Sequence, residues 1–321
     1  MLLKNIRLSL IAILICGSLS AQQDMMLTHF IYNKMMVNPG KTGIDLYNGI
    51  CATTMYRNQW DKVNGAPNST VLVVEGNLTK YFPGGIGLSF ANDAIGFNST
   101  NTLYLNYSYP IQIGKFGVLG VGVGLGMLNL GMNPTWIPPT SAPDNTLPTS
   151  FSATGFDMNF GLYFQGKNFY GGISSTHLPS GILKSTDAVT SYQNAFNIAR
   201  HYYFMGGYRI DKVGSRNGSV DIQAMGQTDF VKFSAQVNAR YIHQLSTDKQ
   251  FYGGLTFRNA DMMAVMAGFT PFKNFTFGYA YDITFLNKLT SVSRGSHELV
   301  VKYCYYLPPP PKSKARHPRW L

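Results

Sequence analysis

The amino-acid sequence predicts an all-β fold: a transmembrane antiparallel outer-membrane β-barrel of about fourteen strands with a plugged lumen. Three observations carry this prediction, namely an alternation of residue types with a period of two, an export signal, and few charges with many aromatic residues. Residues 119–127 alternate bulky apolar residues with glycine, and residues 102–109 and 275–282 alternate apolar residues mostly with small or polar ones. A period of two is typical of strands, here with one face toward lipid and the other toward a polar interior.

Residues 1–21 have the layout of a secretory signal peptide: two basic residues, then an apolar run, then small residues. We therefore exclude them from the fold and expect the mature chain to start at Gln22. Cys16 raises the alternative of a lipoprotein, but the bulky residues before it do not suit a lipoprotein cleavage site. The chain is thus expected to be exported.

The mature chain lacks an uninterrupted apolar stretch of the roughly 18–20 residues that a membrane helix requires. Charged residues make up 13% of the sequence, against about 25% in typical soluble domains, and aromatic residues make up 14%. This composition favours a closed sheet in the cell outer membrane, because a closed sheet pairs all its backbone polar groups within hydrocarbon. A secreted soluble β-sandwich is the alternative.

Alternation and turn residues together place fourteen strands, and an even number puts both chain ends on the periplasmic side. The predicted organisation is a signal peptide at 1–21, an N-terminal arm packed on or in the barrel at 22–48, the barrel at 49–307 and a Pro-rich basic periplasmic tail at 308–321. The predicted strands are 49–59, 69–78, 85–93, 100–110, 116–128, 155–165, 168–175, 198–209, 218–229, 232–243, 249–257, 261–268, 274–282 and 295–306.

The connections between strands give an independent test, because bacterial barrels alternate short periplasmic turns with longer outer loops. Every second connection is short, and the two longest connections, 128–154 and 176–197, both fall on the other side. We therefore expect these two to face outside the cell, although two further outer connections are also short. The first long connection is rich in proline, which prevents it from pairing as sheet. It is interpreted either as a binding surface or as a lid over the pore.

The charged side chains predicted to face the lumen carry both signs, and opposite charges on an inner wall are expected to pair with one another. A porin-like constriction built from opposed charges is the alternative. Fourteen strands make a narrower barrel than a porin, and the arm is too apolar to float in the periplasm, so we expect it to fill the bore. The inward residues are predicted to be Arg57, Glu75, Asp157, Asp221, Arg240, Arg258, Asp282, Glu298 and Lys302.

No catalytic constellation stands out in the sequence. Neither a Gly-x-Ser-x-Gly nor a His-Glu-x-x-His motif is present. The sequence therefore predicts no enzyme, no cofactor and no metal site, with a hydrolase carried in the barrel as the disfavoured alternative. The histidines lie in the arm, loops, strands and tail without close metal-ligand spacing: His29, His177, His201, His243, His297 and His317.

Two cysteines remain after removal of the signal, Cys51 on the first predicted strand and Cys304 on the last. These strands are neighbours in a closed barrel, and parity makes both side chains point inward. Two free thiols are the preferred interpretation, because the register of the closing strands is not determined by the alternation. A disulfide between Cys51 and Cys304 in an oxidising compartment is kept as a hypothesis.

The tail begins with four prolines, which favour an extended polyproline II spacer. We interpret the basic segment that follows as a docking peptide for a periplasmic protein, because its tryptophan adds an anchor that charge alone does not need. Unspecific attraction to anionic headgroups or cell wall is the alternative, and nucleic acid is not expected as a partner. The candidate partner-binding residues are Lys312, Lys314, Arg316, Arg319 and Trp320.

Several short segments together form a recognisable set of motifs. They are Asn38-Pro39 with Gly43, then Tyr56-Arg57-Asn58-Gln59-Trp60 followed by Gly65-Ala66-Pro67, and finally residues 277–282 and 295–298. With these motifs the chain resembles the PorP/SprF family of Bacteroidetes over essentially its whole mature length. The segment from Tyr56 to Pro67 is the most specific part of the resemblance.

The resemblance implies a non-enzymatic outer-membrane component of the type IX protein secretion and gliding machinery. Its implied partners are outer-membrane lipids and either the periplasmic PorK/PorN ring and PorE, for a core PorP-like component, or a SprB-like adhesin, for the SprF type. The arm departs from the family pattern at residues 25–29 and at Gly40, which leaves the subtype open, while the basic tail favours the core type. The alternatives are an outer-membrane channel or hydrophobic-substrate uptake barrel, and an adhesin or receptor acting through the outer loops.

Overall fold

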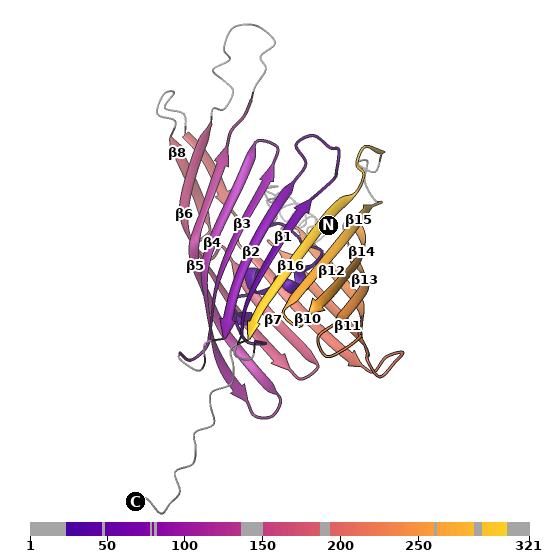
Figure 1. The fold of residues 1–321 in the computed structure, drawn as a ribbon. Helices are drawn as coiled ribbons and strands as arrows, with labels where there is room; N and C mark the ends of the chain where they lie inside the picture. The colour runs from indigo at the N-terminus through magenta and orange to yellow at the C-terminus, as the bar shows by residue number, and fades with distance from the viewer. Residues whose placement is uncertain are drawn as a thin grey trace, which may run out of the picture.

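The computed structural model describes residues 24–46, 49–77, 79, 82–135, 150–186, 193–259, 262–285 and 291–306. Within these residues the chain forms a closed barrel of fourteen strands, which confirms the predicted fold (Figure 1). Each strand pairs antiparallel with its neighbours, and β1 pairs with β16 to close the barrel. The strands are β1 (Gly49–Asn58), β2 (Asn68–Asn77), β3 (Gly85–Ile95), β4 (Asn98–Ile113), β5 (Gly117–Met132), β6 (Phe151–Gly166), β7 (Phe169–Thr176), β10 (His201–Asp211), β11 (Gly218–Thr228), β12 (Phe233–Gln244), β13 (Gln250–Arg258), β14 (Met262–Phe272), β15 (Phe275–Thr284) and β16 (Ser296–Tyr306).

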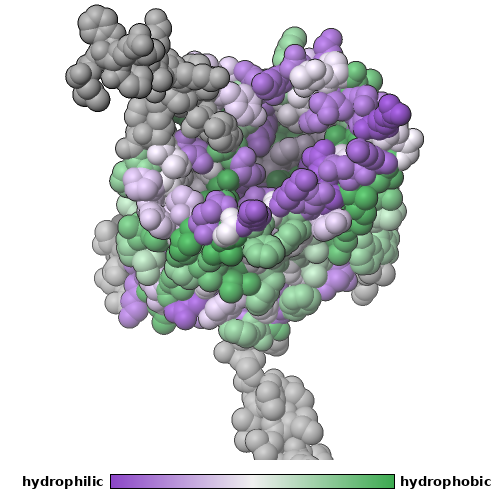
Figure 2. Space-filling view, turned by 90° about the horizontal axis from the view of Figure 1, so that it is seen from below, coloured by the Kyte–Doolittle hydropathy of each residue, from purple (hydrophilic) through white to green (hydrophobic). Residues whose placement is uncertain are grey.

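The two faces of the strands differ as the period of two requires. In β5 the side chains of Val123, Leu125 and Met127 are exposed on the outside of the barrel, whereas Gly122 and Gly124, one residue before Val123 and Leu125, are buried on the inside. In Figure 2 hydrophobic residues, in green, spread over much of the surface in view, and hydrophilic residues, in purple, gather toward one side of it. An apolar outer surface of this kind suits contact with lipid chains.

Several strands are longer than the alternation predicts, among them β3, β4, β5, β6 and β14. Each of β4, β5 and β6 spans 16 residues, because pairing continues past the apolar segment through polar residues. For example, the amide of Asn129 donates to the hydroxyls of Ser152 and Thr154 at 2.9 and 2.8 Å.

The second long outer connection was wrongly predicted to contain no sheet. Residues 176–197 include most of a hairpin of β8 (Gly181–Thr186) and β9 (Gln193–Ile198), which pair only with each other. The hairpin packs on the barrel rim, where Leu183 lies over Gly155 of β6. This contact between distant segments explains why the local pattern gave no signal. In the first long connection, residues 136–149 lie outside the described residues, as do four of its five prolines.

The register of the closing strands decides the state of the two cysteines. Cys51 of β1 lies directly opposite Cys304 of β16, and a disulfide joins their sulfur atoms. Leu46 of the arm packs against this pair. The structure thus has the hypothesised disulfide rather than the two free thiols that were preferred, because parity fixed the face of each cysteine but left the register open.

The N-terminal arm, residues 24–46, lies inside the barrel as a series of short turns. It contains η1 (Phe30–Tyr32), α2 (Lys34–Val37) and η2 (Pro39–Lys41). Met35 packs with wall residues of β1, β2, β3 and β16, and Phe30 and Ile31 pack with wall residues of β6, β10 and β11. The buried apolar core of this protein is therefore the contact between the arm and the inner wall. Among the described residues, no helix has the length and apolar character needed to cross a membrane.

Candidate functional site

The centre of the arm rests directly on the backbone of the wall. At Gly122 of β5, an added Cβ would lie 2.3 Å from both the amide nitrogen of Gly40 and the carbonyl carbon of Pro39. At Gly161 of β6 it would lie 2.1 Å from Oδ1 of Asn38. No side chain fits at such distances, so only glycine lets the arm approach this closely. Glycines of β5 and β6 therefore form a cradle for Asn38, Pro39 and Gly40.

Hydrogen bonds hold the arm in this cradle. The side chain of Asn38 accepts from the Gly40 amide at 2.9 Å and donates to the carbonyl of Leu162 at 3.0 Å. The hydroxyl of Ser108 donates to the carbonyl of Gly40 at 2.8 Å. The motif residues Asn38 and Pro39 are thus contact residues between arm and wall.

A buried ion cluster holds the beginning of the arm. The guanidinium of Arg57 pairs with Asp282 at 2.5 Å and with Glu298 at 3.1 Å, and all three side chains are at most 2% exposed. Glu298 also accepts from the backbone amides of Thr28 and His29 at 2.8 and 2.6 Å and contacts the His29 ring at 2.9 Å. The cluster joins the arm to β1, β15 and β16, so the motif residue Arg57 connects the closing strands to the arm.

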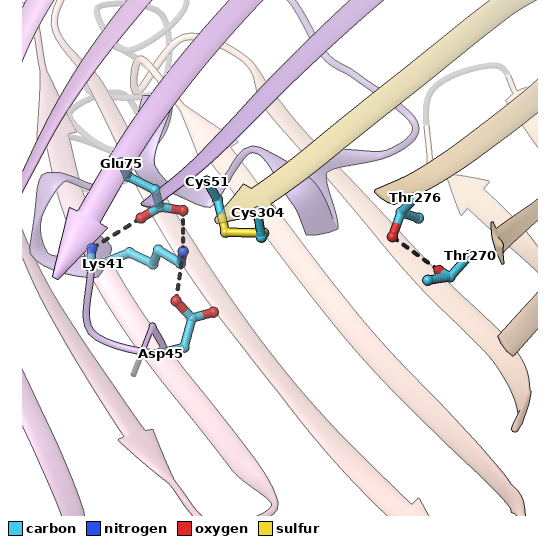
Figure 3. The surroundings of a disulfide bond; sticks show 8 residues. Lys41, Asp45, Cys51, Glu75, Thr270, Thr276 and Cys304 are labelled. Atoms are coloured by element: carbon cyan, nitrogen blue, oxygen red, sulfur yellow. Dashed lines mark hydrogen bonds and ion pairs between the residues drawn. A yellow bond between two sulfur atoms is a disulfide. The ribbon is translucent and has the colours of Figure 1, made fainter. Parts of the chain in front are cut away.

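A second ion cluster holds the end of the arm beside the disulfide. Figure 3 shows Lys41 between Glu75 of β2 and Asp45, with Nζ 2.5 Å and 2.8 Å from their carboxylates. Burial lowers the pKa of Lys41, but the two carboxylates outweigh it and hold the pKa above its ordinary value. Burial raises the pKa of Asp45, and Lys41 outweighs it, lowering the pKa to about 2. Glu75 also accepts from the amide of Gly43, whose φ of +67° favours glycine.

The middle of the arm meets aromatic rings and a further ion pair. Arg240 of β12 pairs with Asp221 of β11 at 2.9 Å and donates to the hydroxyl of Tyr32 at 3.0 Å. The ammonium of Lys34 lies 3.6 Å from the centre of the Tyr170 ring, a cation–π distance. Burial lowers the pKa of Lys34 to about 7. The arm is therefore bound on several sides of the bore.

The first described residue of the arm, Asp24, lies among two histidines and a tyrosine. Its carboxylate is 3.2 Å from Nε2 of His177 and 3.7 Å from Nδ1 of His201, and it accepts from the hydroxyl of Tyr203 at 2.7 Å. The other ring nitrogen of His177 bonds to Asp157. Burial lowers the pKa of His177, but Asp24 and Asp157 outweigh it and raise the pKa to about 10.

This cluster lines a cavity of about 460 Å³ inside the rim that carries the longer connections. Its walls combine the cluster with apolar side chains, including Leu128, Phe151 and Phe196. The sequence analysis predicted no metal or binding site here and missed the cluster. Asp24 and His177 are 153 residues apart, so no motif spacing could have signalled it.

The inward charges lie where parity predicts, but their partners differ in part. Arg57 and Arg240 pair with wall carboxylates as expected. Glu75 instead pairs with Lys41 of the arm, and Asp157 with His177. Of the other predicted inward residues, Arg258 donates to the carbonyl of Met26 at 3.4 Å, and Lys302 lies 5.9 Å from the centre of the Tyr32 ring.

The remaining motif residues lie at the rim. Trp60 has φ of +53°, and its amide donates to the hydroxyl of Ser296 at 3.1 Å, which joins the loop after β1 to the start of β16. Gly65 accepts from the amide of Gly96 at 2.9 Å, and the Tyr56 side chain is exposed on the outer face. The loop itself is closed by backbone hydrogen bonds at Gln59, Ala66 and Pro67, and Asn58 ends β1. The tail candidates Lys312, Lys314, Arg316, Arg319 and Trp320 lie outside the described residues.

Solved structures with a similar fold include the CymD monoaromatic hydrocarbon channel, with 12% identity, a TM-score of 0.52, and coverage of 86% of this chain and 92% of that chain. The Ralstonia pickettii toluene transporter TbuX has 12% identity, a TM-score of 0.51, and coverage of 85% and 93%. The Pseudomonas putida toluene transporter TodX has 10% identity, a TM-score of 0.52, and coverage of 88% and 95%. At these identities the similarity shows the fold alone.

The family comparison covers nearly the whole chain. No curated protein matches this sequence. The family model described as "Type IX secretion system membrane protein PorP/SprF" matches residues 19–303. The match includes the cradle, both ion clusters and the loop from Trp60 to Pro67. This chain therefore belongs to the PorP/SprF family of type IX secretion system membrane proteins.

Proposed function

We propose that this barrel acts in type IX secretion by placement: it holds other components of the machinery at the outer membrane, without catalysis and without an open pore. The observation that carries the proposal is the arm, which fills the bore and is held at its start by hydrogen bonds to buried Glu298 and at its end by the buried Lys41–Glu75 ion pair. Withdrawing the arm would break the Lys41–Glu75 ion pair and the hydrogen bonds that Glu298 accepts from Thr28 and His29. This supports a rigid anchor rather than a channel.

We infer the orientation of the barrel from the connections at its two rims. The start of β1 and the end of β16 lie at the same rim, where Gly49 pairs with Tyr306. Short turns at 114–116 and 167–168 lie at that rim, which we assign to the periplasm because short turns are periplasmic in bacterial barrels. Both chain ends are then periplasmic, and the tail at 308–321 continues from this rim.

The partners are inferred from this orientation and from the family. A tail that begins with four prolines and carries four basic residues and Trp320 is suited to reach a periplasmic protein. For a core component that protein would be the PorK/PorN ring or PorE, and for an SprF-type component the barrel would serve a SprB-like adhesin. The basic tail favours the core assignment.

Deletion of the gene in its source organism tests the function directly. Quantitative proteomics of the medium, cell surface and periplasm would show many type IX cargo proteins retained in the periplasm if the barrel is a core component. Loss of a single surface adhesin would support the SprF type instead. Unchanged secretion in the deletion strain would overturn the proposal.

Substitutions in the tail test the partner. Replacing Lys312, Lys314, Arg316 and Arg319 with serine is expected to release the periplasmic partner, while the barrel stays folded and heat-modifiable. In the matched control each lysine becomes arginine and each arginine lysine, which keeps the charge and should keep the partner. A further variant, Trp320→Ser, separates anchored docking from attraction by charge alone. Equal co-purification in the serine variant and the control would refute the role of the tail.

The main rival is an uptake barrel for a hydrophobic substrate, and the cavity of about 460 Å³ favours it, since apolar side chains line part of its wall. A single-channel conductance in planar bilayers, or a bound hydrophobic molecule in the purified protein, would support this function. If secretion is intact in the deletion strain and either of these results is obtained, the uptake function would take the place of the proposed anchoring function.

A further inference from the structure

We propose that Asp24, His177 and His201 bind a divalent transition-metal ion, with Zn²⁺ as the best match, and that this ion fastens the start of the arm to the wall of the barrel. Asp24 lies in the arm, His177 directly follows β7, and His201 begins β10. A metal bound there would cross-link segments that the chain brings together only by folding. The site does not depend on which secretion partner the barrel holds.

The spacing of the candidate ligand atoms fits a tetrahedral ion. One carboxylate oxygen and one nitrogen from each ring all lie within 4.8 Å of one another. Within the Asp24 carboxylate, Oδ1 lies 3.2 Å from Nε2 of His177 and Oδ2 lies 3.7 Å from Nδ1 of His201. Zinc bonds of about 2.0–2.1 Å in tetrahedral geometry place neighbouring ligand atoms about 3.3–3.5 Å apart. The observed distances lie on either side of that range, so small side-chain rotations would complete the site.

The surroundings already orient two of the three ligands. Nδ1 of His177 bonds to the carboxylate of Asp157, which leaves Nε2 directed at Asp24. Metal-binding histidines commonly donate their other ring nitrogen to a carboxylate in this way. Asp157 is itself held by the hydroxyl of Tyr104 at 2.6 Å. Tyr203 donates to Asp24 at 2.7 Å and so orients the carboxylate as well.

The chemistry of the site selects the metal class. Two imidazoles and one carboxylate suit zinc and its transition-metal neighbours better than calcium or magnesium, which prefer sets of oxygen ligands. Both histidines are almost fully buried, at 6% and 3% exposed, yet the cluster lines the cavity of about 460 Å³. The cavity supplies an entry route and room for a water molecule as a fourth ligand.

Metal titration of the full-length barrel tests the proposal. The protein is purified in detergent without a histidine tag, stripped with a chelator and titrated with Zn²⁺ by calorimetry. One ion per chain is expected, and His177→Gln or His201→Gln should weaken its affinity at least tenfold. The control His243→Gln changes a histidine on β12, outside the cluster, and should bind as wild type.

Two further measurements keep the result interpretable if a wall variant fails to fold. Asp24→Asn changes only the arm and retains the size of the side chain, so the barrel should fold while metal affinity falls. Cobalt substitution of the wild-type protein needs no variant and should give the visible absorption of a four-coordinate nitrogen and oxygen site. The proposal is overturned if wild type takes up no Zn²⁺ at micromolar concentration, or if Asp24→Asn binds it as tightly as wild type.

Discussion

Replacing the buried arginine of the family motif should destabilise the barrel far more than replacing an exposed one. Arg57→Met removes the cation from a cluster in which Arg57 is 2% exposed and both Asp282 and Glu298 are fully buried. Methionine fills similar space but leaves two carboxylates without their main countercharge. Breaking a buried ion pair by removing one partner costs about 3–5 kcal/mol.

The matched control is Arg209→Met on β10. Arg209 pairs with Asp211, and these side chains are 49% and 53% exposed. Water screens such a pair, so its loss should cost about 0–1 kcal/mol. The difference between the two variants corresponds to a change of roughly 10²- to 10³-fold or more in the folding equilibrium, since 1.4 kcal/mol is tenfold.

Urea unfolding in lipid vesicles measures this difference. Tryptophan fluorescence and the heat-modifiable shift on a gel report the folded fraction, and the slope of the transition shows whether the unfolding reaction is the same in each variant. The double variant Arg57→Met with Glu298→Gln provides a further comparison, because it removes one of the stranded charges and should recover part of the loss.

The result that would refute this reasoning is an equal unfolding midpoint for Arg57→Met and Arg209→Met. The reasoning would also be refuted if Glu298→Gln lowered the free energy of unfolding by the same amount in the Arg57→Met background as in wild type. In that case the two substitutions would be additive, and Arg57 would not compensate the buried carboxylate.

Three further outcomes are expected from the contacts of the arm and the closing strands. Cys304→Ala should lower the free energy of unfolding by about 2–5 kcal/mol, and a reductant should bring wild type to the same value, whereas two alkylatable thiols in unreduced wild type would exclude the Cys51–Cys304 bond. Lys34 has a folded pKa of about 7, below its ordinary 10.5. Since the unfolded chain binds more protons between these values, wild-type stability rises with pH there. Lys34→Met should therefore be more stable than wild type by at most about 5 kcal/mol below pH 7, with the gain fading toward pH 10.5, and a pH-independent gain would contradict this. Gly122→Val should expel the arm and expose it to protease, since the added Cβ meets Gly40 at 2.3 Å, whereas Gly253→Val, with no atom within 4 Å, should leave the arm protected.

The sequence by itself determined the strands and the face to which each side chain points. Lipid outside and polar groups inside impose a period of two along every strand, and that signal is local. It was enough to predict that Cys51 and Cys304 face inward, and that Arg57, Glu75 and Asp282 line the bore. The same signal ended too early in β4, β5 and β6, because pairing continues there through polar residues.

The tertiary structure alone decided which of these inward groups meet. The disulfide depends on the register of β1 against β16, and a period of two cannot distinguish one register from another two residues away. The partner of Glu75 is Lys41, because the arm folds back into the bore through short turns that have no periodic pattern. The cluster of Asp24, His177 and His201 forms only when the barrel closes around the arm. Its residues are far apart in the sequence, so no motif spacing predicts it. The alternation of residue types along a strand depends only on whether each side chain faces lipid or the lumen. The contacts that hold the arm, in contrast, depend on how the whole barrel closes.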